Sequence, residues 1–267
     1  MAYFYFIWKF HRSFLIFSTV FISAFQFLIL KVVTTIDYSG MMSFLLQQLP
    51  RNIQTMIGED FISLYTVEGA AALGLNHPLV LAILSIGAII IPARHIAGEA
   101  ETGTLELVLS FPVARTALLL NLWISAVLFL FFIILFAVSS SVLAIHIFHR
   151  LTAGLFMKMV TIGCNLWLVF VFMMSFSLLL SSFGKEGNKV GIRVAGITLV
   201  FYLFHYLSSL WDTLSFTKPY NFFTYYQPED LMTGRRSFSL HFAVLFSLIL
   251  ICLLVSLFQF NRRDIPG

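Results

Sequence analysis

Six long runs of apolar residues constrain this 267-residue chain more than any other feature of its sequence. A helix needs about 20 consecutive apolar residues to cross the hydrocarbon core of a bilayer. The six runs cover residues 13–33, 76–93, 117–148, 155–182, 191–210 and 240–260, and the second can extend toward Gly69. We therefore expect an all-α polytopic membrane protein with six transmembrane helices. A single membrane domain over residues 1–267 is the simplest description.

Composition excludes an ordinary soluble globular protein. Only 10% of the residues are charged and 60% are hydrophobic, whereas soluble domains contain about 25% charged residues. The two cysteines, Cys164 and Cys252, lie inside apolar runs. Their positions predict two small buried side chains and indicate neither a disulfide nor a zinc site.

The basic residues predict the orientation of the chain. With six spans, both termini lie on one side of the membrane. That side carries nine of the 16 basic residues and five of the 12 acidic ones, which gives it a net charge of +4 and leaves the other side at zero. Because basic residues concentrate in the cytoplasm, we expect both termini there, together with residues 96–115.

Two long outer segments join the spans. In residues 34–77, apolar residues recur at helical spacing and predict a helix on the membrane surface: Leu45, Leu49, Ile53 and Met56. The second segment, residues 211–238, is rich in aromatic residues: Trp211, Tyr220, Phe222, Phe223, Tyr225 and Tyr226. Two interpretations of these rings stay open, a belt at the headgroup level and a cap over a substrate path.

The chain offers no phosphate-binding loop and little metal chemistry. Its nearest approach to a Walker A motif, SSFGKEGNKVG, lacks both the earlier glycine and the Ser or Thr after the lysine. We therefore expect no ATP to bind to this chain directly. A soft metal could use four side chains near the end of the third run, His146, His149, Met157 and Met159. Their spacing matches no known site, so we favour packing roles and predict no metal.

The stretch IAGEAETGTLELVLSFPVAR, residues 96–115, is too polar for the bilayer core. Gly103 permits a sharp turn that ends the preceding helix. Leu105, Val108 and Leu109 then share one face of a helix of about two turns. Pro112 ends that helix because it cannot donate a backbone hydrogen bond and disfavours a helical conformation at the residue before it.

The charges of the same stretch point to a protein partner. Glu99 and Glu101 precede the short helix, where its dipole favours negative charge. Glu106 lies on a face other than that of the leucines, and Arg115 starts the next span. A two-turn helix is unstable alone in water, and acidic residues are repelled by a negatively charged leaflet. Docking into a groove of a soluble partner therefore fits better than resting on lipid headgroups, which is the alternative.

This stretch resembles the coupling-helix signature of permease subunits of type 2 ABC exporters, Glu-x-x-x-Gly-Thr-Leu-x-Leu-Leu-Leu-Ser-x-Pro-x-x-Arg. The matching residues are Glu99, Gly103, Thr104, Leu105, Leu107, Leu109, Ser110, Pro112 and Arg115, with Val108 in place of one leucine. The segments YYQPEDLMTG (225–234) and FNRRDI (260–265) also resemble the outer segment before the last span and the cytoplasmic tail of this family.

The resemblance implies a permease that moves substrate out of the cell with energy from ATP. Two permease copies would pair in the bacterial inner membrane and bind two copies of a soluble ABC ATPase. Mg-ATP would be held by that ATPase, so the chain itself would be no enzyme and would bind no cofactor. ATP-driven movement of the ATPases would push residues 103–110 and switch the spans between two states. The implied partners are the ATPase, the second permease and membrane lipid, with no nucleic acid.

Two other function classes remain as alternatives. A secondary transporter or channel without an ATPase needs charged groups near the middle of the membrane. The spans offer mainly polar groups there and no central acid: Gln26, Asn121, Asn165 and His205. A membrane scaffold without transport would show no nucleotide-dependent change in shape. The aromatic-rich spans fit lipids, drugs and peptides equally as substrates.

Overall fold

The computed structural model of the chain describes residues 2–36, 38–48, 66–110, 114–234 and 238–263. Of these residues, 91% are helical and none lies in a strand. Six helical segments are long and apolar enough to cross a membrane. The predicted fold class, an all-α polytopic membrane protein, is confirmed.

Five of the six spans are single helices: α1 (Ala2–Thr35), α8 (Arg115–Phe148), α9 (Ala153–Phe183), α10 (Gly187–Leu210) and α12 (Phe238–Arg262). The second span is composite and runs through α4 (Val67–Leu75), α5 (Pro78–Pro92), the π-helix η1 (Ala93–Gly98) and α6 (Glu99–Glu101). It extends over 35 residues, well beyond the 76–93 of the sequence analysis.

Local chemistry explains how the second span continues through polar residues. Thr66 caps α4 by accepting the Gly69 N–H at 3.1 Å, and the side chain of His77 accepts the Leu79 N–H at the start of α5. Pro92 has no N–H, and the chain continues directly after it as the wider π turns of η1. The Ser177 hydroxyl of α9 donates to the Ile89 carbonyl at 3.0 Å, so a neighbouring helix helps to satisfy the backbone near the proline.

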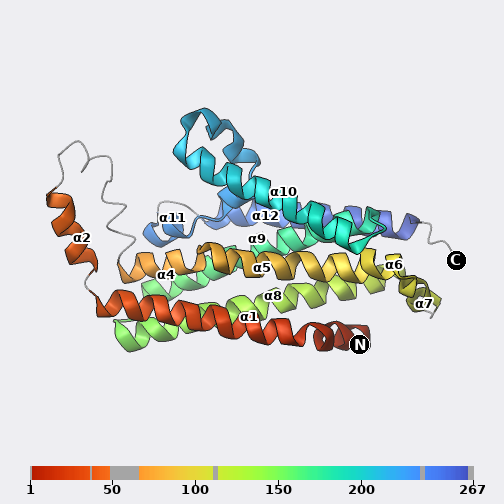
Figure 1. Cartoon of the computed structure of the whole chain (residues 1–267), viewed down its shortest axis with the longest axis horizontal. Coiled ribbons are helices and arrows are strands. Elements are labelled where there is room, and N and C mark those ends of the chain that lie inside the picture. The colour runs from red at the N-terminus through yellow and green to blue at the C-terminus, as the bar shows by residue number, and fades with distance from the viewer. Residues whose placement is uncertain (1, 37, 49–65, 111–113, 235–237, 264–267) are drawn as a thin grey trace.

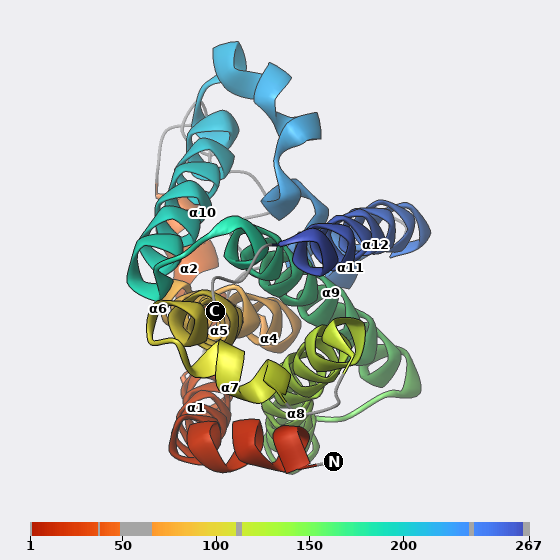
Figure 2. The same cartoon turned by 90° about the vertical axis from the view of Figure 1, so that its right-hand side faces the viewer.

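The spans are arranged around α9, which has the largest buried share of the six, whereas α10 has the smallest. Helices α5 and α12 both pack on α9, and α1 packs mainly on α8. Helix α10 leans away from the bundle and leads to the 3₁₀ helix η2 (Asp212–Tyr220) (Figure 1, Figure 2).

Both ends of the chain lie at the same end of the bundle as α6 and the short helix α7 (Thr104–Ser110) (Figure 1). The opposite end carries α2 (Tyr38–Gln47), η2, η3 (Phe222–Tyr225) and α11 (Pro228–Thr233). Of the expected surface helix, Leu45 is an exposed residue of α2. Leu49, Ile53 and Met56 lie outside the described residues.

Three polar residues of the spans hydrogen-bond to the rest of the fold. Gln26 of α1 is fully buried and accepts a hydrogen bond from Ser141 of α8 at 3.3 Å. Asn165 of α9 donates to the Tyr225 carbonyl at 2.9 Å, and Asn121 donates to a carbonyl of its own helix. Two of these bonds join α1 to α8 and α9 to η3. The Nε2 atom of Gln26 and the Oδ1 atom of Asn165 have no hydrogen-bond partner among the described residues.

Candidate functional site

The turn before α7 has the conformation that Gly103 was expected to permit. Its φ is +73°, in the left-handed region that L side chains rarely adopt. The Thr104 hydroxyl lies 2.9 Å from that of Thr102 and donates to the Glu99 carbonyl at 3.3 Å. These contacts fix the direction in which α7 leaves the second span. Pro112, the expected end of α7, lies outside the described residues.

The two faces of α7 are reversed relative to our expectation. Leu105, which was expected to lead the face that meets a partner, is 0% exposed and belongs to the core of its own chain. Val108 and Leu109 pack partly against the same core. The outward face consists instead of Glu106, Leu107 and Ser110, and Leu107 is 67% exposed. The side chain of Leu105 is therefore covered by its own chain in this structure, and its expected contact with a partner stays a prediction.

One side of the α6–α7 stretch is attached to α10. The Glu101 carboxylate accepts the N–H of Gly187, the first residue of α10, at 2.9 Å. A carboxylate at this position is also stabilised by the positive, N-terminal end of the α10 helix dipole. A Cβ added to Gly187 would lie 2.9 Å from the Cα of Gly98, so the two backbones meet where a larger residue would not fit. The small residue at 187 therefore allows η1 and α10 to cross closely.

The other side of the stretch is attached to α9 and α12. Arg115, which begins α8, donates to the Arg263 carbonyl at 2.7 Å, just beyond α12. The Arg263 guanidinium in turn lies 3.4 Å from the carbonyls of Ser181 and Ser182 in the last turn of α9. Burial lowers the pKa of Arg263. The segment before α7 and the start of α8 after it are thus hydrogen-bonded to α10 and to the end of α12, and Arg263 extends the second contact to α9.

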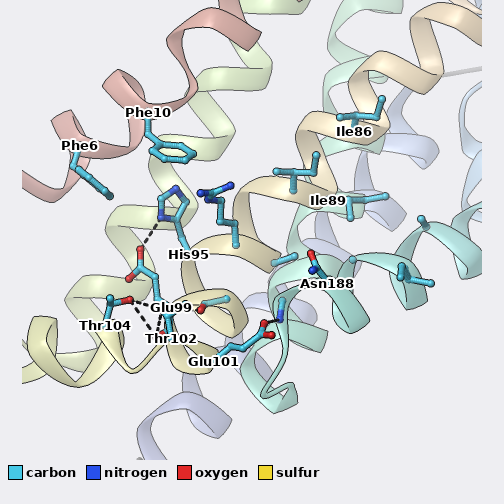
Figure 3. Close-up of a pocket in the computed structure, with 18 of the residues that line it drawn as sticks. Phe6, Phe10, Ile86, Ile89, His95, Glu99, Glu101, Thr102, Thr104 and Asn188 are labelled. Atoms are coloured by element: carbon cyan, nitrogen blue, oxygen red, sulfur yellow. Dashed lines mark hydrogen bonds and ion pairs between the residues drawn. The ribbon is translucent and has the colours of Figure 1, made fainter.

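A buried network that the sequence did not indicate lies beside Glu99. The Nδ1 atom of His95 is 2.8 Å from Glu99 Oε1 (Figure 3). Its Nε2 atom is 3.1 Å from Nε2 of His11 in α1. Both histidines are buried. Since only one proton fits between two nitrogens at that distance, the two imidazoles are not both cations. Through His95, Glu99 thus belongs to a contact between the second span and α1.

A cavity of about 1190 Å³ opens beside this network. Its walls come from α1, the α5–η1–α6 segment, α7 and α10. Figure 3 shows the rings of Phe6 and Phe10 on one side, Glu99, Thr102 and Thr104 at the base, and Ile86, Ile89 and Asn188 on the far side. The cavity combines apolar walls with charged and hydroxyl groups at the α7 end, which suits ligand binding.

The outer aromatic residues divide into two groups. Phe222, Phe223 and Tyr226 are buried, and the rings of the first two contact Phe201 and Tyr202 of α10. Trp211 and Tyr220 are 60% and 82% exposed. The three buried rings therefore pack into the bundle at the end opposite α7. The two exposed rings point outward, as the side chains of an aromatic belt at the membrane surface would.

The metal-binding alternative finds no support in the described part of the chain. No group of three or more His, Cys, Asp or Glu residues that could hold an ion occurs there. Met159 is fully buried whereas Met157 is 62% exposed, so the two side chains point to different surroundings. His146 and His149 lie at the end of α8 beside a separate small cavity of about 430 Å³.

Comparison with known proteins agrees with the fold and with the resemblance of residues 96–115. No curated protein matches the chain significantly. The family model described as ABC-2 family transporter protein matches residues 10–265, which is nearly the whole sequence and includes every spanning helix except the first turns of α1. The chain is an integral membrane protein that belongs to the ABC-2 transporter family and serves as an ABC transporter permease.

Proposed function

We propose that this permease works in an ATP-driven exporter of the bacterial inner membrane, with both termini in the cytoplasm. Two copies of the chain pair and bind two soluble ABC ATPase subunits, which hold the Mg-ATP. The ATPases dock on the outward face of α7. The observation that carries this proposal is an exposed leucine on a short helix whose flanking residues, Glu101 and Arg115, are hydrogen-bonded to other spans.

The attachments explain how movement of α7 would reach the membrane. Displacement of α7 pulls α10 through Glu101 and Gly187. It also pulls α9 and α12 through Arg115 and Arg263. Leu105 transmits the push because its side chain is packed without free surface, and close-packed interiors deform little. A force on α7 would thereby be passed to α9, α10 and α12, whose movement the transport cycle would require.

Leu107→Asp tests the docking face. Covering a leucine at an interface contributes about 1.5–3 kcal/mol, so we expect the variant to recover at least ten-fold less ATPase than wild type at equal permease levels. The matched control is Leu45→Asp, the same change at a residue that is 46% exposed at the opposite end of the bundle. Wild-type recovery of the ATPase with Leu107→Asp would contradict docking on this face.

The secondary-transporter alternative gains no specific support. Among the described residues, the buried Gln26 and Asn165 bond to neighbouring elements of the fold. Glu99 lies at the α7 end of the bundle and contacts His95. Neither Gln26 nor Asn165 is an acid in the middle of a span, which a secondary transporter would need, so the geometry favours the ATPase-coupled function.

A further inference from the structure

A group of basic side chains lies where α8 ends and α9 begins, at the end of the bundle opposite α7 (Figure 1). His149 and Arg150 follow α8 directly, and His146 lies one helical turn before Arg150; all three are exposed. Lys31 of α1 joins them, because its Nζ atom lies 5.0 Å from the ring centroid of Phe148. The ends of two neighbouring spans thus meet at a basic corner, which consists of Lys31, His146, His149 and Arg150.

The charge of the basic corner is not neutralised within the described part of the chain. Neither Lys31 nor Arg150 belongs to an ion pair between described residues, since these pairs lie at the α7 end. Glu68, an exposed acid in the first turn of α4, which packs on α1, pairs with neither cation. In the orientation that we propose, this end faces away from the cytoplasm, where basic residues are usually sparse. An anionic ligand would therefore complete the charge balance of the corner.

The basic corner contains space and donors for a phosphate group. The open cavity of about 430 Å³ is lined by residues 146–151, which include both histidines and the arginine. A guanidinium matches the geometry of phosphate oxygens, and an imidazole N–H can donate to them. The ammonium of Lys31 keeps N–H donors for an anion, because the Phe148 ring contacts only one side of it.

The surface next to the cavity is apolar. Ile147 lines the cavity and is 55% exposed. Leu143 lies one helical turn nearer to the middle of the span, on the same face of α8, and is also exposed. A ligand with an anionic head and an apolar chain can therefore use the corner and the adjoining face of α8 together, whereas a soluble anion would use the corner alone.

We propose that the basic corner binds the headgroup of an anionic phospholipid, with the phosphate between Lys31 and Arg150 and an acyl chain along Leu143 and Ile147. Such a lipid would bridge the ends of α1 and α8. In the orientation that we propose for the permease, it comes from the outer leaflet of the inner membrane. The binding itself requires neither the ATPase nor a direction of transport, so the inference can fail or hold independently of the proposed function.

The test compares two phospholipids that share their acyl chains and differ in the charge of the headgroup. The full-length chain in a neutral detergent is titrated with phosphatidylglycerol or phosphatidylcholine, and native mass spectrometry measures the fraction of chains that retain one lipid. We expect phosphatidylglycerol to be retained at least roughly five-fold better, since each basic residue favours an anionic lipid by about this factor. Glycerol 3-phosphate, which offers the phosphate without acyl chains, should not displace the lipid at equal concentration. Displacement by it would assign the corner to a soluble anion and overturn the lipid assignment.

Three variants test the location of the site. Arg150→Gln and Lys31→Gln should each lower the preference for phosphatidylglycerol by roughly five-fold. Lys218→Gln is the matched control, because Lys218 is an exposed cation of η2 at the same end of the bundle but lies outside the basic corner. All three side chains are exposed, so we expect melting temperatures close to that of wild type.

Two results would overturn the assignment to this corner. One is equal retention of the two lipids by the wild-type chain. The other is a loss of preference with Lys218→Gln that equals the loss with Arg150→Gln, because the attraction would then be a property of the whole basic surface. ATPase recovery with the same preparations reports separately on the proposed function, since the basic corner and α7 lie at opposite ends of the bundle.

Discussion

At the scale of single residues, Gly103 shows how one backbone conformation positions the docking helix. Its φ of +73° disfavours every side chain, although a Cβ there would meet no neighbour. Gly103→Val should therefore destabilise the turn by about 1–2 kcal/mol or more through backbone strain, and should lower both the melting temperature and ATPase recovery. Gly103→Asn is the control, because asparagine tolerates the left-handed region better. Equal losses for both variants would show that side-chain volume matters instead.

Tyr226 provides a test of burial at the outer end of the bundle. Burial raises the pKa of its phenol well above 10, with a further contribution from the negative charge of Glu229. The folded protein thus keeps this proton when the unfolded chain loses it, so the free energy of unfolding falls as pH rises above about 10. Tyr226→Phe should remove this part of the alkaline loss, by up to about 1.4 kcal/mol per pH unit.

Melting temperatures of wild type and Tyr226→Phe at pH 8 and pH 11 check this expectation. Tyr220→Phe, at a residue that is 82% exposed, controls for the loss of a phenol. We expect the difference in melting temperature between wild type and Tyr226→Phe to change from pH 8 to pH 11. A difference that is the same at both values would contradict the argument from burial.

At the scale of elements, the short helix shows what sequence periodicity can and cannot predict. The spacing of Leu105, Val108 and Leu109 correctly places them on one face and Glu106 on another. It does not say whether that face meets a partner or the helix's own bundle, since both surfaces are apolar. Leu105 is covered by its own chain, and Leu107, which we had treated only as part of the family motif, is the exposed one.

The second span shows a different limit of sequence reasoning. Arg94 and His95 follow the apolar run that ends at residue 93, and charged side chains usually mark the end of a span. In the fold, His95 can be buried to 2% exposure because both of its ring nitrogens have hydrogen-bond partners, His11 and Glu99. His11 is 84 residues away in sequence. No local pattern indicates such a pairing, so both the longer span and the cavity beside it required the structure.

At the scale of the whole molecule, the arrangement of the ends makes the topology testable. Both termini lie at the α7 end (Figure 1), so they share the side on which an ATPase would dock. A fluorescent-protein fusion after Gly267 should fluoresce in a bacterial host, and an alkaline phosphatase fusion there should be inactive. A phosphatase inserted after Tyr220, at the opposite end, should be active. The reverse pattern would place α7 outside the cell and remove any access to ATP.

The contact between Arg115 and the Arg263 carbonyl also has a consequence for the order in which the molecule is made. The two residues are 148 positions apart, so the ribosome needs roughly 7–30 s to reach the second after the first. During that interval, Arg115 lacks this acceptor, and the last carbonyls of α9 lack the guanidinium that later binds them. In the orientation that we propose, the cytoplasmic end of the bundle would therefore be the last to close, after the other spans have entered the bilayer.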